Sequence, residues 1–481
     1  MLAAAALFAA CNKDEEVKKP ELSLSLNSVK ASAEGGIYTV EITSNIEWTV
    51  TTDDQTWYSI DKTSGENNGV VTITIDNNGT SSAREASVII SGESMTYYVS
   101  ISQSALPVPE AISNDLRLVG DSQVLDYELS ADYDYSVDSD VDWISVVKGE
   151  GKFTLNIAEN NGCEVRVGNV VARVSDDNLL AEIVIMQYPK ASAPKPGEFL
   201  IEEVYFTGSL IEGSETSSGD QYIKITNNSD HPVYADGILF CMNYINGFKT
   251  GVGAHYDYPA LDTEGIAVTN MYRIPGSGTD HVVYPEESLI LAINAQNYTE
   301  ENPNAIDLSK ADFEFNDVND IYPDTDNPDV EDLLIWFKSS RTITSLHNRG
   351  FEGYAIVLPP AEETAESIMT NHHWTGSYTF DFTNPVTGQT FHFEYDIADD
   401  DAFLIPAEWV LDAVNCTTED AFYRNPWGAA FDAGWTHAGD FDGDISRFGK
   451  SVKRESVNGK LVDTNNSTND FIPNATPSLK K

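Results

Sequence analysis

Three aspartates at alternate positions near the C-terminus are the residues best suited to hold a metal ion. Asp440, Asp442 and Asp444 present carboxylates, and calcium, a hard cation, prefers oxygen ligands. The stretch departs from an EF-hand loop because Gly443 falls two residues early and the twelfth position is Ser451. We therefore expect calcium as a candidate ligand. The alternative is a solvated turn, since Asp and Gly are common turn formers.

The same stretch is rich in aromatic residues and glycines. The segment RNPWGAAFDAGWTHAGDFDGD (424–444) contains Trp427, Trp435 and His437. So irregular a segment either packs its rings against a core or exposes them to a partner, and exposed rings beside Asp440 would mark a recognition surface. We predict ligand binding at Trp427, Trp435 and His437, with core packing as the alternative.

Other groups suited to chemistry are less organised. Residues 324–332 (DTDNPDVED) form a second acidic cluster, and His372 is followed by His373. The chain lacks the His-Glu-x-x-His, Gly-x-Ser-x-Gly and Gly-x-x-x-x-Gly-Lys motifs of zinc hydrolases, serine hydrolases and phosphate-binding loops. Carboxylate pairs for glycoside cleavage are a weak signal among 77 acidic residues. We expect no catalytic residues, and a divergent hydrolase is the least favoured alternative.

The charge balance bears on the class of partner. The 481 residues include 28 basic and 77 acidic side chains, for a formal net charge of −49. Binding to a phosphate backbone depends on Lys and Arg to release counterions. We therefore expect no nucleic acid partner. A hydrophobic content of 41% predicts packed cores, and the length suggests about three domains.

Two segments repeat one pattern of short strands. GGIYTVEITSNIEWTVTTDDQTWYSI (35–60) aligns with SQVLDYELSADYDYSVDSDVDWISV (122–146), and residues 77–79 (NNG) align with residues 160–162. Alternating apolar residues rich in Val, Ile and Thr predict half-buried strands, and several such strands between turns predict a β-sandwich. Residues 21–106 and 107–190 are each expected to form one.

The aromatic residues of the repeats have two interpretations. Trp48 lies in phase with Val50 and is expected in the core, as is Trp143. Trp57 and Tyr58 are adjacent and would point to opposite faces of an extended strand. One of these two rings could therefore be exposed and stack on a sugar ring, so we predict Trp57 and Tyr58 as candidate ligand-binding residues.

The first repeat resembles the BACON domain, a Bacteroidetes-associated carbohydrate-binding module. The resemblance rests on SNIEWTV, TWYSI, ITIDNNGTSSAREASVIIS and ISQSA, and the second repeat matches more weakly because Tyr135 stands where the first has Trp48. The resemblance implies binding to carbohydrate. A spacer that holds the C-terminal domain away from a membrane is the alternative.

The N-terminus resembles that of a bacterial lipoprotein. Residues 1–10 (MLAAAALFAA) have the apolar core of a signal peptide, and Phe8-Ala9-Ala10-Cys11 resembles a lipobox. We expect a signal peptide at 1–10 and lipidation at Cys11; the alternative is a short signal core with an incidental cysteine. The resemblance implies an outer-membrane lipid anchor.

The residues that follow Cys11 refine this expectation. In the linker 11–20, the export-signal candidates Lys13, Asp14, Glu15 and Glu16 resemble the acidic tag of Bacteroidetes lipoproteins that face the extracellular side. A charged linker kept solvated next to an anchor is the alternative. If Cys11 is lipidated, the remaining thiols are Cys163, Cys241 and Cys416, which exclude a disulfide framework but leave one Cys241–Cys416 bridge open.

Residues 191–197 are a linker rich in Pro, Ala and Lys, and residues 198–481 form the last predicted domain. LIEEV, QYIKITNNSD, ADGILF, ESLILAI and DTNNSTNDF resemble lamin-tail-like domains, which are immunoglobulin-type sandwiches. The domain as a whole resembles a family of Bacteroidetes surface lipoproteins often encoded near TonB-dependent transporters. Residues 406–416 (PAEWVLDAVNC) predict a short helix. Long insertions near 241–283, 297–330 and 361–450 are where binding is expected.

These observations predict an all-β fold: two tandem immunoglobulin-like β-sandwiches and a larger lamin-tail-like β-sandwich with insertions and a short helix. The expected function is that of a lipid-anchored surface protein that captures a glycan or another nutrient alongside a TonB-dependent outer-membrane transporter. A structural adaptor without a small ligand is the main alternative.

Overall fold

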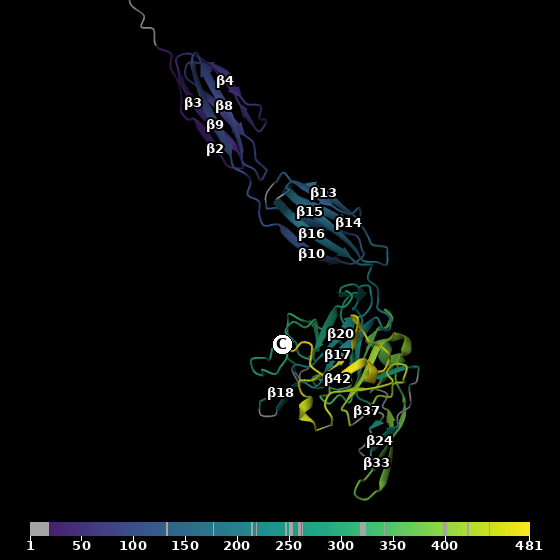
Figure 1. The fold of residues 1–481 in the computed structure, drawn as a ribbon. Coiled ribbons are helices and arrows are strands. Elements are labelled where there is room, and N and C mark those ends of the chain that lie inside the picture. The colour runs from purple at the N-terminus through teal and green to yellow at the C-terminus, as the bar shows by residue number, and fades with distance from the viewer. Residues whose placement is uncertain are drawn as a thin grey trace, which may run out of the picture. The chain divides into compact units, whose positions relative to one another are not determined.

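The computed structural model describes residues 19–481 except 131–132, 177, 213–214, 218, 246–247, 250–253, 258–260, 262, 318–323, 341, 398–401, 421–422 and 442. The chain divides into two compact units, residues 1–160 with 164–187, and residues 161–163 with 188–481. Strands dominate both units (Figure 1), which confirms the predicted all-β class. Cys11, Lys13, Asp14, Glu15, Glu16 and Asp442 lie outside the described residues.

The first repeat is a sandwich of two sheets. One sheet has the order β1(Leu22–Leu24)-β3(Gly36–Ser44)-β7(Gly69–Ile75)-β5(Tyr58–Ile60), and the other has the order β2(Ser28–Ala31)-β9(Met95–Gln103)-β8(Arg84–Gly92)-β4(Glu47–Thr52)-β6(Ser64–Glu66). Val40, Ile42, Val71 and Ile73 alternate with exposed or half-buried residues and fill the space between the sheets. The predicted period of two is therefore the period of burial.

The second repeat has the same plan with fewer strands. Its sheets have the orders β10(Ile112–Leu118)-β16(Asn178–Gln187)-β15(Arg166–Ser175)-β12(Ser136–Ser139) and β11(Gln123–Glu128)-β14(Lys152–Ile157)-β13(Ile144–Gly149). In both repeats an early strand pairs in parallel with the last one, β2 with β9 and β10 with β16. Trp48 and Tyr135 are both buried, which confirms that they take equivalent places in the two cores.

The second unit is built on two larger sheets. The seven-stranded sheet has the order β30(Glu331–Asp332)-β29(Phe313–Glu314)-β28(Ser288–Ala292)-β20(Tyr222–Asn227)-β17(Phe199–Tyr205)-β39(Ser451–Arg454)-β42(Phe471–Ala475). The six-stranded sheet has the order β31(Leu334–Lys338)-β26(Asn270–Arg273)-β22(Leu239–Asn243)-β32(Glu352–Val357)-β36(Val410–Thr417)-β38(Thr436–His437). Strands β17 and β39, some 250 residues apart in the sequence, lie side by side.

Two hydrophobic cores lie on opposite faces of the six-stranded sheet. Along β22, Phe240 and Met242 face the core shared with the seven-stranded sheet, whereas Leu239 and Cys241 face a second core. Elements from the predicted insertions cover this second core: β25(Gly265–Val268), β35(Phe403–Pro406), η1(Ala407–Trp409) and α1(Ala365–Asn371). The insertions thus form a third layer and are more than surface loops.

The predicted helix at 406–416 is wrong. These residues end β35, form the short 3₁₀ turn η1 and continue as β36. All eight residues of β36 are buried because the strand has a core on each side, with Val410 and Ala413 in one and Leu411 and Val414 in the other. A strand buried on both faces shows no alternation, and its apolar residues can imitate a helical period.

The remaining elements are short and mostly pair locally. They are β18(Ser209–Ile211), β19(Glu215–Ser217), β21(Val233–Tyr234), β23(Phe248–Lys249), β24(Ala254–Asp257), β27(Val282–Val283), β33(Gly376–Thr383), β34(Thr390–Ile397), β37(Tyr423–Arg424), β40(Ser456–Val457), β41(Lys460–Leu461), α2(Ser467–Asp470) and η2(Ile445–Arg447). The sheet of β24, β33 and β34 projects from its domain (Figure 1). Within the described residues, no helix has the length and hydropathy needed to cross a membrane.

The three described cysteines are free thiols. Cys241 and Cys416 are buried on opposite faces of the six-stranded sheet, in different cores. Burial raises the pKa of both thiols. They act as small core residues, and the bridge left open between them is not formed.

Candidate functional site

The predicted aromatic surface around Trp427 is largely buried. Trp427 is 1% exposed and its Nε1–H donates to the carbonyl of Ala267 over 2.8 Å. Gly353 makes room for this indole, because a Cβ there would lie 2.6 Å from the ring. Trp427 therefore belongs to the second core and offers no ring face to a ligand, which corrects its assignment as a binding residue.

Trp435 and His437 remain closer to the surface. Both are half-buried, with ring centroids 5.6 Å apart, and the backbone N–H of Trp435 donates to Thr468. Burial lowers the pKa of His437, against the opposing charges of Glu419 and Asp440. Burial thus favours the neutral imidazole, the form that a metal ion or a hydrogen-bond donor requires.

The aspartate stretch behaves as a turn. Asp444 is the N-cap of η2, and its carboxylate accepts hydrogen bonds from the N–H groups of Asp440 and Ser446 and from the Ser446 hydroxyl, over 2.8–3.0 Å. The bond from the Asp440 backbone is the main cause that lowers the pKa of Asp444. Because this carboxylate is engaged locally, the turn alternative accounts for Asp444 and calcium is not needed to explain it.

Trp57 and Tyr58 are held inside the first repeat. Tyr58 is 6% exposed, and its hydroxyl donates to Asp53 over 2.8 Å. Trp57 is half-buried, the Arg84 guanidinium lies 4.6 Å from its ring centroid, and the Tyr58 ring meets it at an angle. Tyr58 is therefore a core residue, and Arg84 covers the Trp57 ring that was expected to stack on a sugar.

The second repeat has the same arrangement. Arg166 lies 4.3 Å from the centroid of the Trp143 ring, as Arg84 does over Trp57. Buried asparagines also correspond: Asn78 and Asn160 each donate their amide to backbone carbonyls. The structural match is thus Asn78 with Asn160, one residue away from the alignment of the NNG motifs.

Glu314, which lies outside the acidic segment 324–332 in the sequence, joins two of its carboxylates in the structure. Carboxylate oxygens of Glu314, Asp326 and Asp332 lie within 4.8 Å of one another. Burial raises the pKa of Glu314, although the N–H groups of Asn327 and Ala295 donate to it. Three converging carboxylates suit a calcium ion, and among the described residues, which do not include Asp442, this geometry occurs here. The sequence could not add Glu314, because parallel pairing of β29 with β30 brings it there.

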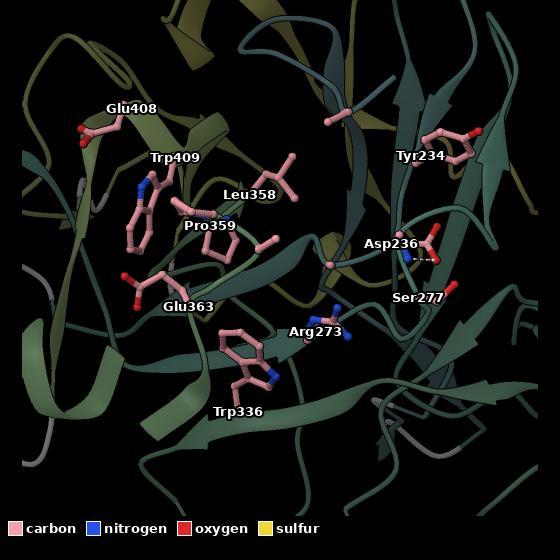
Figure 2. A pocket seen from close by; sticks show the side chains of 15 residues that line it. Tyr234, Asp236, Arg273, Ser277, Trp336, Leu358, Pro359, Glu363, Glu408 and Trp409 are labelled. Atoms are coloured by element: carbon pink, nitrogen blue, oxygen red, sulfur yellow. Dashed lines mark hydrogen bonds between the residues drawn. The ribbon is translucent and has the colours of Figure 1, made fainter. Parts of the chain in front are cut away.

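A cleft of about 740 Å³ on the second unit is the best-formed candidate for a ligand site (Figure 2). Its walls carry the aromatic rings of Trp336 and Trp409, the charged groups of Arg273, Glu363 and Glu408, and an apolar strip that runs through Leu358 and the following prolines. This volume lies within the range of about 300–1,000 Å³ that is typical of small-molecule sites.

A β-bulge aims one of these rings. Strand β26 pairs with the edge strand β31, but the register moves from Met271–Phe337 to Tyr272–Ile335 and leaves Trp336 without a partner in the ladder. A bulge of this kind redirects the extra side chain. Arg273 ends β26, and its guanidinium lies 5.8 Å from the Trp336 ring centroid. The pair reaches the cleft together (Figure 2).

The opposite wall comes from the end of β32 and from η1. The N–H of Leu358 donates to the carbonyl of Trp409 over 2.7 Å, which ties the two segments together. Trp409 also contacts the ring of His372, with centroids 5.0 Å apart. Glu363 precedes α1 and accepts a 2.5 Å bond from Ser367, a residue of the helix capping box. Figure 2 shows Glu363 and Glu408 on the side away from Arg273.

Most polar groups of the cleft have hydrogen-bonding capacity left. Arg273 makes neither a hydrogen bond nor an ion pair with the residues that the structure describes, and the same holds for the carboxylate of Glu408. The indole N–H groups of Trp336 and Trp409 likewise donate to none of the described residues. The half-buried ring of Trp336, the indole of Trp409, which is 8% exposed, and several free donors and acceptors therefore converge on one open cleft.

Sequence reasoning did not identify this cleft. Arg273, Glu363 and Glu408 lie in the predicted insertions, where binding was expected, but no motif links them. The available signal was the tryptophan in each of LLIWFK and PAEWV, of which the second lies in the segment predicted to be a helix. Their convergence depends on the bulge and on the pairing of β32 with β36.

Comparison with known families finds matches in both units of the chain. The BACON profile, described as "Putative binding domain, N-terminal", matches residues 47–104 and 133–188, and the DUF4876 profile, described as a protein of unknown function, matches residues 284–478. A search of curated proteins returned no match.

Two similar solved structures come from Bacteroides species. A DUF4876 family protein from Bacteroides thetaiotaomicron is 21% identical over 75% of this chain and 95% of its own, with a TM-score of 0.42. The GH5 xyloglucanase of Bacteroides ovatus is 28% identical over 20% of this chain and 22% of its own, with a TM-score of 0.17. Two segments of the chain thus match the BACON profile, and a third segment, C-terminal to them, matches the DUF4876 profile.

Proposed function

We propose that this protein captures an oligosaccharide at the cell surface, in the cleft of its C-terminal domain. The observation that carries the proposal is the convergence of Trp336 and Trp409 with the free guanidinium of Arg273 in one open cleft. A sugar has an apolar C–H face and a rim of hydroxyls. Indole rings suit the face, and the guanidinium and carboxylates suit the rim.

The remaining parts of the proposal concern location and partners. Lipid at Cys11, with Lys13, Asp14, Glu15 and Glu16 as the export signal, would anchor the chain on the extracellular side of the outer membrane. The two BACON domains would present the C-terminal domain, and their family description as binding domains is consistent with a further sugar contact. A TonB-dependent transporter would import the captured ligand.

A glycan array, followed by calorimetry on the full chain, tests the capture of an oligosaccharide. We expect at least one oligosaccharide to bind, and Trp336→Ala to weaken that binding about tenfold or more, because the ring supplies most of the apolar contact. Trp57→Ala is the matched control, since the Trp57 ring lies under Arg84 in the first repeat. Binding that survives loss of Trp336, or no glycan binding at all, would contradict the proposal.

A structural adaptor is the second candidate, and the projecting sheet of β24, β33 and β34 favours it. Val386 is 91% exposed, Phe391 40% and Phe393 42%. The register pairs Phe393 with Phe380 and Phe391 with Phe382, so aromatic positions meet across both strands. An exposed apolar patch of this kind is typical of a protein–protein contact, and the partner we propose is the outer-membrane transporter.

Purification of the tagged, lipidated protein from gently solubilised outer membranes, with mass spectrometry, tests this candidate. The adaptor predicts a stoichiometric transporter that is lost in the variant with Phe391→Ser and Phe393→Ser. The control is His392→Ser, because His392 lies between these residues on the other face of β34 and pairs with Asp381. If no transporter is recovered, or if the double variant retains it, the adaptor role of this sheet is excluded.

A further inference from the structure

We propose that the cleft selects an oligosaccharide that carries one uronic acid residue, whose carboxylate pairs with Arg273. This inference rests on the proposed capture of an oligosaccharide and names the class of ligand. Three observations support it. The guanidinium of Arg273 has no hydrogen-bond or ion-pair partner among the described residues, the acidic side chains of the cleft lie away from it, and nearby Asp236 is hydrogen-bonded to its own loop.

Arg273 is pre-arranged to receive an anion. Its guanidinium lies against the Trp336 ring, 5.8 Å from the centroid, and it has no carboxylate partner among the described residues. Because none of the described residues accepts a hydrogen bond from this guanidinium, its N–H groups can meet a carboxylate through two parallel hydrogen bonds.

Asp236 lines the same end of the cleft but is engaged by its own loop. Its carboxylate accepts hydrogen bonds from the N–H groups of Gly278 and Asp280 over 3.3 and 3.0 Å, and from that of His281 over 2.8 Å. The His281 ring lies 3.4 Å from it. This carboxylate holds the 277–281 loop and leaves the guanidinium edge of Arg273 available to a ligand.

The other end of the cleft sets the direction of binding. Figure 2 shows Glu363 and Glu408 on the side away from Arg273, with the apolar strip between. Carboxylates accept hydrogen bonds from sugar hydroxyls but repel an anion. A ligand must therefore place its charge at Arg273 and neutral sugars at the glutamates. A glycan charged on every residue would bring a carboxylate against Glu363 or Glu408 and would be disfavoured.

The test measures binding of matched pairs of oligosaccharides to the full chain by calorimetry. The probes are tetrasaccharides from glucuronoxylan, pectin and alginate, each compared with its carboxyl-reduced form, in which a CH₂OH group replaces the carboxylate. We expect an oligosaccharide with a single uronic acid to bind about tenfold tighter than its reduced form, because the charged hydrogen bonds are lost on reduction. Fully uronic oligosaccharides should bind more weakly than the singly charged one.

Three variants separate the charge from the rest of the cleft. Arg273→Gln should weaken binding of the acidic probe about tenfold more than binding of its reduced form, so that the difference between the two forms disappears, whereas Arg273→Lys should restore part of the difference. Trp336→Ala should weaken both forms alike. Arg173→Gln is the matched control, because Arg173 is also half-buried and its guanidinium makes no hydrogen bond or ion pair with the described residues, but it lies in the second repeat.

The outcomes distinguish this inference from the proposed function. Equal affinity for the acidic and reduced forms, or an acid preference that survives Arg273→Gln, overturns the inference while capture of oligosaccharides stands. Binding restricted to neutral glycans of the array has the same meaning. If no oligosaccharide binds, charged or neutral, both the inference and the proposed function are wrong.

Discussion

Arg84, Arg166 and Arg273 each lie near the ring of a tryptophan, and the two regions of the chain use this pair differently. In the repeats, Arg84 and Arg166 each donate to a glutamine side chain and to backbone carbonyls. In the C-terminal cleft, Arg273 has a ring contact alone. An arginine–tryptophan pair thus stabilises the sandwich in each repeat, whereas in the C-terminal cleft the pair remains available to a ligand. The difference is that the guanidinium has hydrogen-bond acceptors within the protein in the repeats, whereas in the proposed binding cleft it has none among the described residues.

The largest effect is expected from breaking the closed pair of the first repeat. Gln103 is buried, accepts a bond from Arg84 and donates to the carbonyls of Ser32, Ala33 and Asp76 over 2.8–3.1 Å. Gln103→Ala removes these hydrogen bonds and the packing of a buried side chain, and it should lower the free energy of unfolding of the repeat by about 3 kcal/mol. Denaturant unfolding measures it.

The control for that substitution is Ser102→Ala, one residue earlier on the same strand, which should change stability by less than about 0.5 kcal/mol. If Gln103→Ala were equally mild, the buried amide would not be what closes the repeat.

The next largest effect is the pH dependence of the free energy of unfolding, which is expected to differ between the two units. The repeats are closed by neutral amides, whereas the C-terminal core contains Glu352, whose pKa burial raises to about 7, against hydrogen bonds from His347 and Tyr354. Because the folded pKa lies above the unfolded one, its contribution to stability is full below about pH 4.5 and is lost as the pH rises through 7.

We therefore expect the C-terminal domain to lose on the order of 2 kcal/mol between pH 5 and pH 8. Hydrogen exchange of β32, compared with that of β8, would report the two units separately. Glu352→Gln should remove most of this slope because the amide oxygen can still accept both bonds. A slope that persists in this variant would assign it to another group.

A smaller effect is expected when alanine replaces Trp336 in the cleft or Trp57 in the first repeat, because one substitution should change affinity and the other stability. Trp336→Ala should reduce oligosaccharide affinity about tenfold, which corresponds to about 1.4 kcal/mol, with little change in unfolding. Trp57→Ala should do the reverse, because its ring packs under Arg84. Calorimetry measures the affinity of both variants, and denaturant unfolding measures their stability. If both substitutions changed stability alone, the comparison between the two regions would not hold.

The smallest effect is expected from Arg273 itself. Because its guanidinium has no hydrogen bond to satisfy within the described chain, Arg273→Gln should change the free energy of unfolding by less than about 0.5 kcal/mol. Arg166→Gln, its counterpart in the second repeat, should cost clearly more, since it removes the bonds to Gln187 and Ala158. Equal costs would show that Arg273 has a structural role.

Local patterns predicted much of the fold. Alternating residues such as Val40 and Ile42 indicated strands with one buried face, and the matching aromatic positions of the repeats indicated two copies of one sandwich. Prediction failed where a strand has a core on each side, as at Val410–Thr417, because burial there does not alternate. It failed likewise at Trp427 and Tyr58, since the exposure of a ring depends on what lies above it.

The amino-acid sequence by itself determined the class of fold, the duplication and the two family matches, because these depend on periodicity and on residues close together in the chain. Only the tertiary structure decided which polar groups remain free. Arg273, Trp336, Glu363 and Trp409 are separated by tens of residues and converge through sheet pairing and one β-bulge. Arg84 has hydrogen-bond acceptors beside it in the folded protein, whereas Arg273 has none among the described residues. This difference depends on neighbours in space, which no local sequence pattern contains.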